Sequence, residues 1–533
     1  MPNDIGKARL NNIARRHKKP CLIEQRKQKS FKILMAVSKC FFFYIIIAFL
    51  LTGCSTAKYS SYNPQNKIPP EKLKKDFILL KKILEANHPS LYWYTPKDSI
   101  DLYFNKTMQS INDSLTESQF RIKVAWFISK IRCGHTSVRP SKKYITYISK
   151  HDYNRFPLLL KVWKDSMVVL TSLNRSDSIF KRGTLVTSVE GHNTRELLDS
   201  MSQFISTDGY ADNFKCQAIS FNFPVYYSFA YPIKDSFLIS YTDSTGMQKE
   251  NYVKLFKPDL DTAKLTVPHV KTRPPTHKEK KMISLLSKRS ITYDTASNSA
   301  YMRLATFSDG KLNSFFKRSF EELKNKNIPN LIIDLRENTG GNINTSINLA
   351  RYIKDKSFHL ADTVAAINRS LTYGKYIYPS LPYRIVMRFT TRKKADDKFH
   401  FVALEKYTYD PYRKLHYNGN VYIVQGGYTF SAAAMFVLNV KGQQNVTVVG
   451  EETGGGDYGT SAIHLPSIVL PNSKLQVVLP LYRIVDDHTK IKDGRGIQPD
   501  IFIPPSSAAI KQGIDPKLQG VKKLIQQHAA KGN

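Results

Sequence analysis

The stretch TFSAAA at residues 429–434 decides how this chain is interpreted. It places Ser431 between a short apolar run, residues 421–424, and an alanine-rich segment that favours a helix up to residue 440. Turn residues lie between them, so the pattern predicts a strand, a tight turn and a helix whose first turn holds Ser431. The free N–H groups of a helix start favour negative charge, which a serine alkoxide or a tetrahedral oxyanion carries. The alternative is that Ser431 is only the N-cap of this helix.

A second segment, DLRENTGG at residues 334–341, follows an expected buried strand over residues 330–335. The paired glycines Gly340 and Gly341 let the backbone turn tightly and approach a ligand closely, although a structural turn alone would also explain them. The backbone N–H groups of these glycines and of Ala432 are therefore candidates for an oxyanion hole, which acyl transfer requires.

Four stretches in fixed order resemble the C-terminal processing peptidase and tricorn protease family. They are DLRENTGG at 334–341, TFSA at 429–432, VVGEET at 448–453 and GIQPD at 496–500. The resemblance covers roughly residues 70–505. It implies an α/β catalytic domain of the ClpP/crotonase-like type, with an N-terminal helical region and a PDZ-like β-rich domain. It also implies a serine peptidase with Ser431 as the nucleophile.

The resemblance also implies which residue acts as the base that activates the serine. In the processing-peptidase branch a lysine does this, but the corresponding position here is Gly456. In the tricorn-like branch the base is a histidine, and His135 stands in a similar G-H-T stretch. This stretch follows an expected amphipathic helix that begins at a capping box, residues 116–119, so that His135 falls on a loop. A histidine there could exchange the serine proton, or could merely complement the helix dipole.

A third group should orient the histidine. The tricorn-like tetrad has a glutamate shortly before the closing motif, and Asp493 occupies that place here. A solvated loop charge is the alternative interpretation of Asp493, and Glu451 and Glu452 are rival candidates. The serine that precedes the base in tricorn is Gly134 in this chain. No metal or cofactor is implied.

The N-terminus indicates export. Residues 41–51 form a continuous apolar run of signal-peptide length, which is short for a membrane span, although a transmembrane anchor is the alternative. The run ends in LTGC, which resembles a bacterial lipobox with Cys54 as the acylated residue. Because residues 1–34 are long for a signal n-region, we expect the true start at Met35. The expected product is a membrane-anchored lipoprotein of the bacterial cell envelope, on the periplasmic side or at the outer membrane.

Charge and cysteine content narrow the possible partners. The 533 residues contain 80 Lys and Arg against 43 Asp and Glu, a net charge of +37. Such an excess favours a polyanionic partner, and export together with the lack of a nucleic-acid motif favours anionic lipid or envelope polymers over nucleic acid. Beyond Cys54 only Cys133 and Cys216 remain, which could form one bridge but which we expect to be free thiols.

The expected domain organisation follows composition and motifs. A basic, proline-containing stretch before residue 293 separates the two larger modules. The expected parts are a signal region (1–53), a lipidated tether (54–69), a helical domain (70–150), a PDZ-like domain (151–257), a basic linker (258–292), a catalytic α/β domain (293–510) and a C-terminal tail or helix (511–533). Residues 373–417, dense in Tyr, Arg and Lys, are expected to be an insertion that either flanks the substrate groove or packs through its aromatic rings.

These observations favour an exported, lipid-anchored serine endopeptidase that cleaves peptides or proteins in the cell envelope. A rival hypothesis is a catalytically silent peptide- or ligand-binding lipoprotein on the same fold. A third hypothesis, an envelope scaffold that uses the PDZ-like module alone, would leave Ser431 unexplained.

Overall fold

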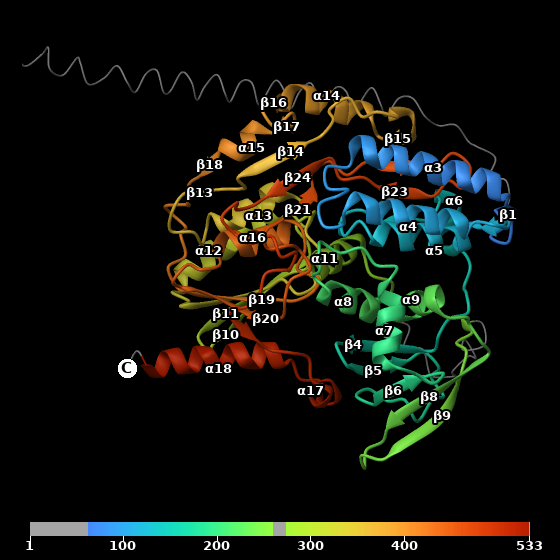
Figure 1. The fold of residues 1–533 in the computed structure, drawn as a ribbon. Coiled ribbons are helices and arrows are strands. Elements are labelled where there is room, and N and C mark those ends of the chain that lie inside the picture. Colours follow the sequence, from blue (N-terminus) through green and yellow to red (C-terminus); the bar gives the residue numbers. More distant parts are fainter. Residues whose placement is uncertain (1–61, 259–272, 532–533) are drawn as a thin grey trace, which may run out of the picture. The chain divides into compact units, whose positions relative to one another are not determined.

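A computed structural model describes residues 62–258 and 273–531 of the chain (Figure 1). The expected signal region, Met35 and the lipobox Cys54 lie outside the described residues. Within those two ranges, no helix combines the length and the apolar character that a bilayer crossing needs.

The N-terminal part is helical, as the sequence predicts. Its helices are α3 (Pro70–Asn87), α4 (Lys97–Gln109), α5 (Glu117–Ser129) and α6 (Lys142–Ile148), with the short strands β1 (Lys67–Ile68), β2 (Leu115–Thr116) and β3 (Val138–Arg139). The predicted capping box starts α5: Thr116 Oγ1 accepts a hydrogen bond from the Gln119 amide, and the Gln119 side chain accepts one from the Thr116 amide. Helix α5 therefore ends close to the loop that carries His135.

The following module is a six-stranded antiparallel sheet with its own core. The strands lie in the order β4 (Leu158–Trp163), β5 (Ser166–Ser172), β6 (Leu185–Val189), β8 (Ser236–Thr242) and β9 (Gln248–Lys254), and β7 (His192–Asn193) pairs with β6. Three helices interrupt the strands: α7 (Thr194–Ser202), α8 (Asn213–Phe221) and α9 (Phe223–Ala230). The sequence predicts mostly strands here, so these helices were missed. We call residues 151–257 the β-rich module, and its PDZ-like character stays a prediction.

Part of the expected basic linker is helical. Helix α11 (His277–Lys288) begins at a capping box formed by Thr276 and Glu279, and β10 (Arg289–Asp294) follows without a break. The Lys-rich composition of this stretch concealed the helix, although the T-x-x-E pattern of its cap is visible in the sequence.

The catalytic region is built on a six-stranded sheet. Its order is β10, β11 (Ser299–Leu304), β12 (Asn330–Asp334), β19 (Asn420–Gln425), β20 (Val446–Gly450) and β25 (Ile501–Phe502). All neighbours are parallel except β10 and β11. Helices α12 (Leu312–Asn325), α13 (Ile343–Ala350) and α16 (Ala432–Val440) contribute to the main core on one face. Helix α18 (Pro516–Lys531) packs against the other face, and α17 (Ser507–Gln512) precedes it (Figure 1).

Smaller sheets surround this central sheet, and strands of the expected insertion, residues 373–417, belong to them. One has the order β16 (Arg392–Lys393), β17 (Phe399–His400), β14 (Thr363–Ala366), β24 (Tyr482–Val485) and β21 (Gly459–Ala462). Another has the order β15 (Ile377–Tyr378), β22 (Ser467–Val469), β23 (Gln476–Val478) and β3, and β13 (Phe358–His359) pairs with β18 (Thr408–Tyr409). The insertion also holds the 3-10 turn η1 (Gly374–Tyr376), α14 (Leu381–Thr390) and α15 (Val402–Lys406).

The helical region and the catalytic region share one core. A single cluster of buried apolar side chains runs from Leu73 and Phe77 of α3 to Ile423 of β19 and Ile484 of β24. In addition, β3 pairs directly with β23, so the segment after His135 joins a sheet of the catalytic region. The helical region therefore packs as part of the catalytic body, whereas the sequence predicts a separate domain.

Candidate active site

Ser431 occupies a strained turn between β19 and α16. Its backbone has φ of +54° and ψ of −127°, a conformation that costs a non-glycine residue about 1–3 kcal/mol and that often marks functional sites. Ser431 is the N-cap of α16, but its side chain makes no capping hydrogen bond. The hydroxyl is therefore left for another partner, which the N-cap interpretation does not explain.

That partner is His135. The Nε2 atom of His135 lies 3.0 Å from Ser431 Oγ, although the two residues are 296 positions apart in the chain. The imidazole also packs against the Phe430 ring, with 4.6 Å between ring centroids. Burial lowers the pKa of His135 to about 4, so the ring is neutral at pH 7 and can accept a proton. The structure thus brings the two residues of the predicted pair together.

The far nitrogen of His135 faces a hydroxyl and, behind it, a carboxylate. Thr460 Oγ1 lies 3.4 Å from His135 Nδ1 and donates a 2.7 Å hydrogen bond to Asp208 Oδ2. Because this hydroxyl donates its only hydrogen to Asp208, it can only accept a hydrogen bond from His135. The ring proton of His135 is therefore on Nδ1. Nε2 is then the lone-pair nitrogen that faces Ser431, the tautomer that a general base needs.

Asp208 is buried at the junction of three segments. Besides Thr460, its carboxylate accepts a 2.8 Å hydrogen bond from the amide of Gly134 and another from the amide of Gly456. Burial raises the pKa of Asp208 to about 6, although these hydrogen bonds act in the opposite direction. Asp208 belongs to the loop between α7 and α8, so the β-rich module contributes directly to this site.

The carboxylates considered from the sequence lie elsewhere. Asp493 is exposed and accepts a hydrogen bond from the Arg495 amide, without contact to His135. Glu452 pairs with Arg495 over 2.6 Å, and Glu451 pairs with the buried Lys517 over 2.6 Å. The structure therefore gives none of these residues the orienting position and places Asp208 there, through Thr460.

Sequence reasoning missed Asp208 and Thr460 for a physical reason. Both lie on strand or loop segments without a motif of their own, and their mutual contact spans 252 positions. The Thr207-Asp208-Gly209 turn was the one available signal, but an Asp-Gly pair is typical of many turns. Only the fold shows that this Asp-Gly turn is part of the site.

The candidate oxyanion hole lies at the start of α16. The amide of Ala432 has no hydrogen-bond acceptor among the described residues, and the same holds for Gly341 in that part of the chain. The Gly340 amide, by contrast, donates to Asn338 Oδ1 over 2.9 Å. A Cβ atom at Gly340 would lie 2.7 Å from Ser431 Cβ and 2.9 Å from the Ala432 amide nitrogen. Gly340 thus supplies close approach, while Ala432 and Gly341 supply free donors.

The sequence model of peptidase family S41 matches residues 298–503. The segment that carries Ser431 therefore matches family S41, and the chain is a serine-type peptidase. The match covers β11 to β25, which includes Ser431, whereas His135 and Asp208 lie before it.

Solved structures resemble this S41 peptidase beyond the matched region. Mature CPAF in complex with lactacystin superposes with a TM-score of 0.61 at 15% identity, covering 86% of this chain and 98% of that one. A second structure of mature CPAF gives a TM-score of 0.59 at 14% identity, covering 86% and 97%. At these identities the likeness is one of fold. No curated protein matches the chain in sequence.

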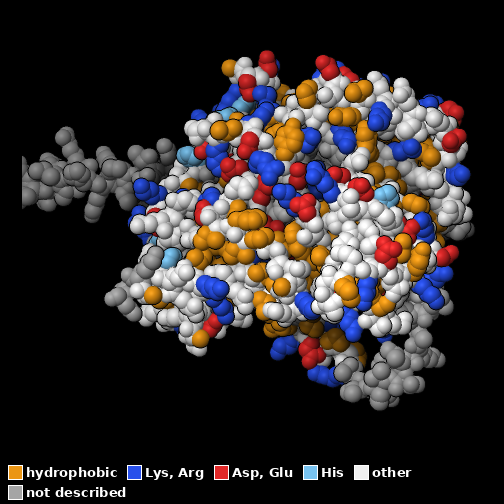
Figure 2. All heavy atoms as spheres, turned by 60° about the horizontal axis from the view of Figure 1, so that its bottom comes forward, with side chains coloured by type: hydrophobic (Ala, Val, Ile, Leu, Met, Phe, Trp, Pro, Cys, Tyr) orange, Lys and Arg blue, Asp and Glu red, His pale blue; other side chains and the backbone are white. Residues whose placement is uncertain are grey.

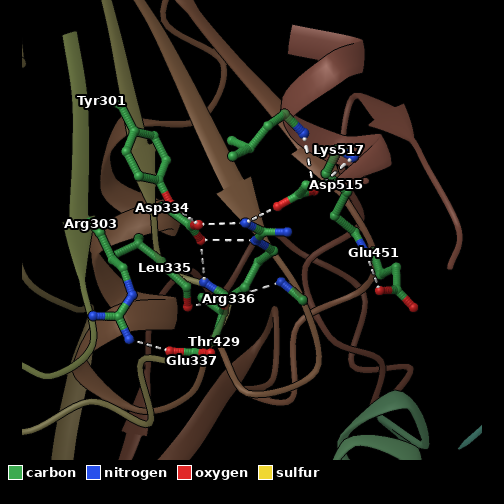
Figure 3. Close-up of polar contacts among 12 residues, drawn as sticks. Tyr301, Arg303, Asp334, Leu335, Arg336, Glu337, Thr429, Glu451, Asp515 and Lys517 are labelled. Atoms are coloured by element: carbon green, nitrogen blue, oxygen red, sulfur yellow. Dashed lines mark hydrogen bonds and ion pairs between the residues drawn. The ribbon is translucent and has the colours of Figure 1, made fainter. Parts of the chain in front are cut away.

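Asp334 and Arg336, the first two charged residues of the 334–341 motif, link the end of β12 to the residue just before α18 (Figure 3). Arg336 makes two hydrogen bonds to the Asp334 carboxylate, of 3.0 and 2.6 Å, and a 2.7 Å ion pair with Asp515 at the start of α18. Tyr301 also donates to Asp334 over 2.7 Å. Burial alone would raise the pKa of Asp334, but the hydrogen bonds and the charge of Arg336 outweigh it and lower this pKa.

The motif also contacts the nucleophile turn directly. Thr429 Oγ1 donates to the carbonyl of Leu335 over 2.9 Å, and the Phe430 amide donates to the carbonyl of Asn338 over 3.1 Å. These bonds fix the glycine turn against Ser431. The D-x-R-x-N frame therefore acts as a support for the site and does not touch the reacting atoms.

Two large cavities lie beside the candidate site. One, of about 850 Å³, is lined by residues of all three regions, among them Tyr94, Tyr210 and Arg495. The other, of about 680 Å³, lies between the β-rich module and the catalytic region and reaches Tyr428 in the nucleophile turn. Neither is lined by Ser431 or His135.

In the described ranges, no three His, Cys, Asp or Glu side chains are grouped so that they could hold a metal ion. Cys133 and Cys216 form no disulfide.

Proposed function

We propose that this S41 peptidase is an exported, lipid-anchored endopeptidase of the bacterial cell envelope, with Ser431 as nucleophile and His135 as base. The observation that carries the catalytic part is the 3.0 Å contact between His135 Nε2 and Ser431 Oγ. It supports acyl transfer because a hydroxyl becomes an effective nucleophile only beside a base that takes its proton.

The proposed reaction has two steps. In the first, Ser431 Oγ attacks the peptide carbonyl carbon while its proton moves to His135 Nε2, and the amides of Ala432 and Gly341 bind the resulting oxyanion. Collapse breaks the C–N bond, and His135 returns the proton to the leaving amine, which leaves an acyl-enzyme. In the second step, His135 takes a proton from water while the water oxygen attacks the acyl carbon. The bond from that carbon to Ser431 Oγ then breaks, His135 returns the proton to Oγ, and the acid product leaves.

Asp208 acts on this reaction through Thr460. Once His135 carries a second proton, its Nδ1–H donates to a hydroxyl that is polarised by the Asp208 carboxylate. This arrangement stabilises the imidazolium, which burial alone disfavours. Asp208 is thus proposed as a positioning residue that also supplies negative charge behind the base.

The test compares peptide turnover by the purified wild-type chain with that of Ser431→Ala, His135→Ala and the double variant. Each single change should reduce kcat by about two to four orders of magnitude, and the double change should cost little more, because the pair acts as one unit. Melting temperatures should stay near that of the wild type. No turnover by the wild-type chain would favour the rival hypothesis of a silent binder, and measurable turnover that is equal in all four proteins would contradict the roles of Ser431 and His135.

The lipid anchor is proposed from the sequence alone, because Cys54 lies outside the described residues. Residues 41–51 and the LTGC stretch favour cleavage before Cys54 and acylation of its thiol. Mass spectrometry of the membrane fraction should find an N-terminal peptide that begins at acylated Cys54. An unmodified soluble chain, or one that begins upstream of Cys54, would contradict the anchor and leave the catalytic proposal intact.

A further inference from the structure

Helix α14 (Leu381–Thr390), in the insertion between the two S41 motifs, is held in one orientation. Its Met387 side chain is fully buried, and the Tyr383 ring packs against His464 with 4.9 Å between ring centroids. Strand β15, just before it, pairs with β22. The helix is therefore fixed by its inner face, and the side chains of its outer face cannot turn into the core.

The outer face of α14 is apolar. Leu381, Ile385 and Phe389 follow one another at four-residue spacing, which places them along one stripe of the helix. Their exposed fractions are 55%, 46% and 85%. Single exposed apolar residues are common, but a continuous stripe of three on a fixed helix marks a surface for interaction.

The residues beside this stripe are basic and unpaired. Residues 373–394 contain six Lys and Arg and no Asp or Glu. Arg384 and Arg388 lie one turn apart along the stripe, and Arg392 follows at its end; no carboxylate of the described chain forms an ion pair with any of the three. Lys393 and Lys394, in contrast, pair with Asp397 and Glu405.

We propose that α14 docks on an anionic lipid surface, with Leu381, Ile385 and Phe389 in the interface and the three arginines at the phosphate level. An amphipathic helix with a Phe- and Leu-containing face and flanking arginines is typical of helices that lie in the bilayer interface. Charge supports lipid as the occupant, because the patch is basic throughout and the chain carries a net charge of +37. The location of α14 also supports a lipid surface as the occupant, since no residue of the helix lines either of the two large cavities.

On the face of the molecule that Figure 2 draws, the basic side chains are less concentrated. In Figure 2, Lys and Arg side chains are scattered over the face drawn, among acidic and apolar ones. Such scattered charge attracts a polyanion weakly and without orientation, whereas α14 combines unpaired arginines with an exposed apolar stripe. The proposal therefore assigns orientation at the membrane to this helix.

The experiment uses the full chain with Phe389→Trp and measures tryptophan emission after the wild-type signal is subtracted. The vesicles contain brominated phosphatidylcholine, either alone or with phosphatidylglycerol. Emission of the variant should shift to the blue and be quenched with the anionic vesicles, and much less with the neutral ones. Tyr252→Trp is the matched control, since Tyr252 is 66% exposed on β9 of the β-rich module, and its emission should not change.

A second variant tests the role of charge. Arg384→Gln/Arg388→Gln/Arg392→Gln in the Phe389→Trp background changes only exposed side chains and should lower vesicle affinity by at least about tenfold, with a smaller difference at high salt. No shift with anionic vesicles, or an equal shift with neutral ones, would overturn the proposal. A shift that grows with protein concentration in the absence of vesicles would overturn it in favour of a second copy of the chain.

Discussion

Thr460 donates a 2.7 Å hydrogen bond to Asp208, and this contact joins strand β21 of the S41 domain to a loop of the β-rich module. The same carboxylate accepts a hydrogen bond from Gly134, the residue before His135. A displacement of the β-rich module would therefore remove both the support of the His135 loop and the charge behind the imidazole. One buried carboxylate of the β-rich module thus contacts both the hydroxyl behind the imidazole and the backbone of the His135 loop.

Replacing Asp208 should have a large effect on turnover and a smaller effect on the free energy of unfolding. Asp208→Asn keeps the shape of the side chain but removes its charge, so we expect kcat to fall by about 10- to 100-fold, less than the effect of losing the base itself. Steady-state kinetics on a peptide substrate measure this. Asp493→Asn is the matched control, because Asp493 is exposed and away from His135, and it should leave kcat unchanged. The reverse ranking of the two variants would restore Asp493 as the orienting group.

The pH dependence of kcat/KM should reflect two groups. As pH rises, His135 loses its proton around pH 4 and becomes a base, and Asp208 then ionises around pH 6 and stabilises the imidazolium in the transition state. Activity should therefore rise between about pH 4 and 7 and level off above, and Asp208→Asn should lack the upper part of the rise. A histidine of ordinary pKa would place the rise nearer neutrality. A rise confined to pH values above about 9 would instead indicate a lysine base.

Gly340 should not tolerate a side chain. With φ of +97°, Gly340→Ala carries the backbone strain of any L-residue, and its Cβ would also lie 2.7 Å from Ser431 Cβ and 2.8 Å from the Phe430 carbonyl oxygen. Gly442→Ala is a matched control, because Gly442 has φ of +84° and open space around the added Cβ. We expect both to lose about 1–2 kcal/mol of stability from strain, but only Gly340→Ala to lose most of its activity. Equal activity of the two variants would argue against close approach at Gly340.

His88 should support the His135 loop and contribute to the loss of folding stability at acidic pH. Its Nδ1 accepts from the Ser90 amide, so its Nε2–H donates to Thr136 Oγ1 over 2.8 Å, within the G-H-T stretch. Burial lowers the pKa of His88 to about 3. Between about pH 6.5 and 3 the unfolded chain takes up a proton that the folded chain does not, so the free energy of unfolding falls as pH falls.

His88→Gln should be less stable than the wild type at pH 7, by about 1–3 kcal/mol, because the buried Thr136 hydroxyl and the packing around it are disturbed. The difference between the two proteins should shrink as pH decreases to 4, since the variant lacks the titrating group. Urea unfolding at pH 7, 5.5 and 4 measures this. A difference that stays constant over this range would mean that His88 is not a neutral buried group.

Local patterns of the sequence predicted the elements around the nucleophile. The strand before Ser431 is β19, the helix after it is α16, and the capping box at Thr116 and Gln119 starts α5. These elements follow from turn residues, hydrophobic runs and caps, which act over a few positions. The glycine turn and the nucleophile turn could be paired in advance because their motifs resemble one family.

Contacts between distant segments could not be predicted in the same way. Asp208 reaches Thr460 only because the loop after α7 lies against the catalytic region, and no periodicity in residues 206–212 indicates this. Helices α7, α8 and α9 were missed because their surroundings are rich in aromatic and β-branched residues, which favour strands. The helical domain was expected to be separate, since sequence shows that a helix has an apolar face but does not show which partner covers it.

The central claim is tested most directly by labelling the purified full-length chain with a fluorophosphonate probe, which reacts with activated serine hydroxyls. The account predicts that mass spectrometry finds the adduct on Ser431 in the wild type, that Ser431→Ala is not labelled, and that His135→Ala reacts at least about 100-fold more slowly while retaining its melting temperature. Labelling of Ser431 at an unchanged rate in His135→Ala would contradict the assignment of the base, and no labelling of the folded wild-type chain would contradict the catalytic account as a whole.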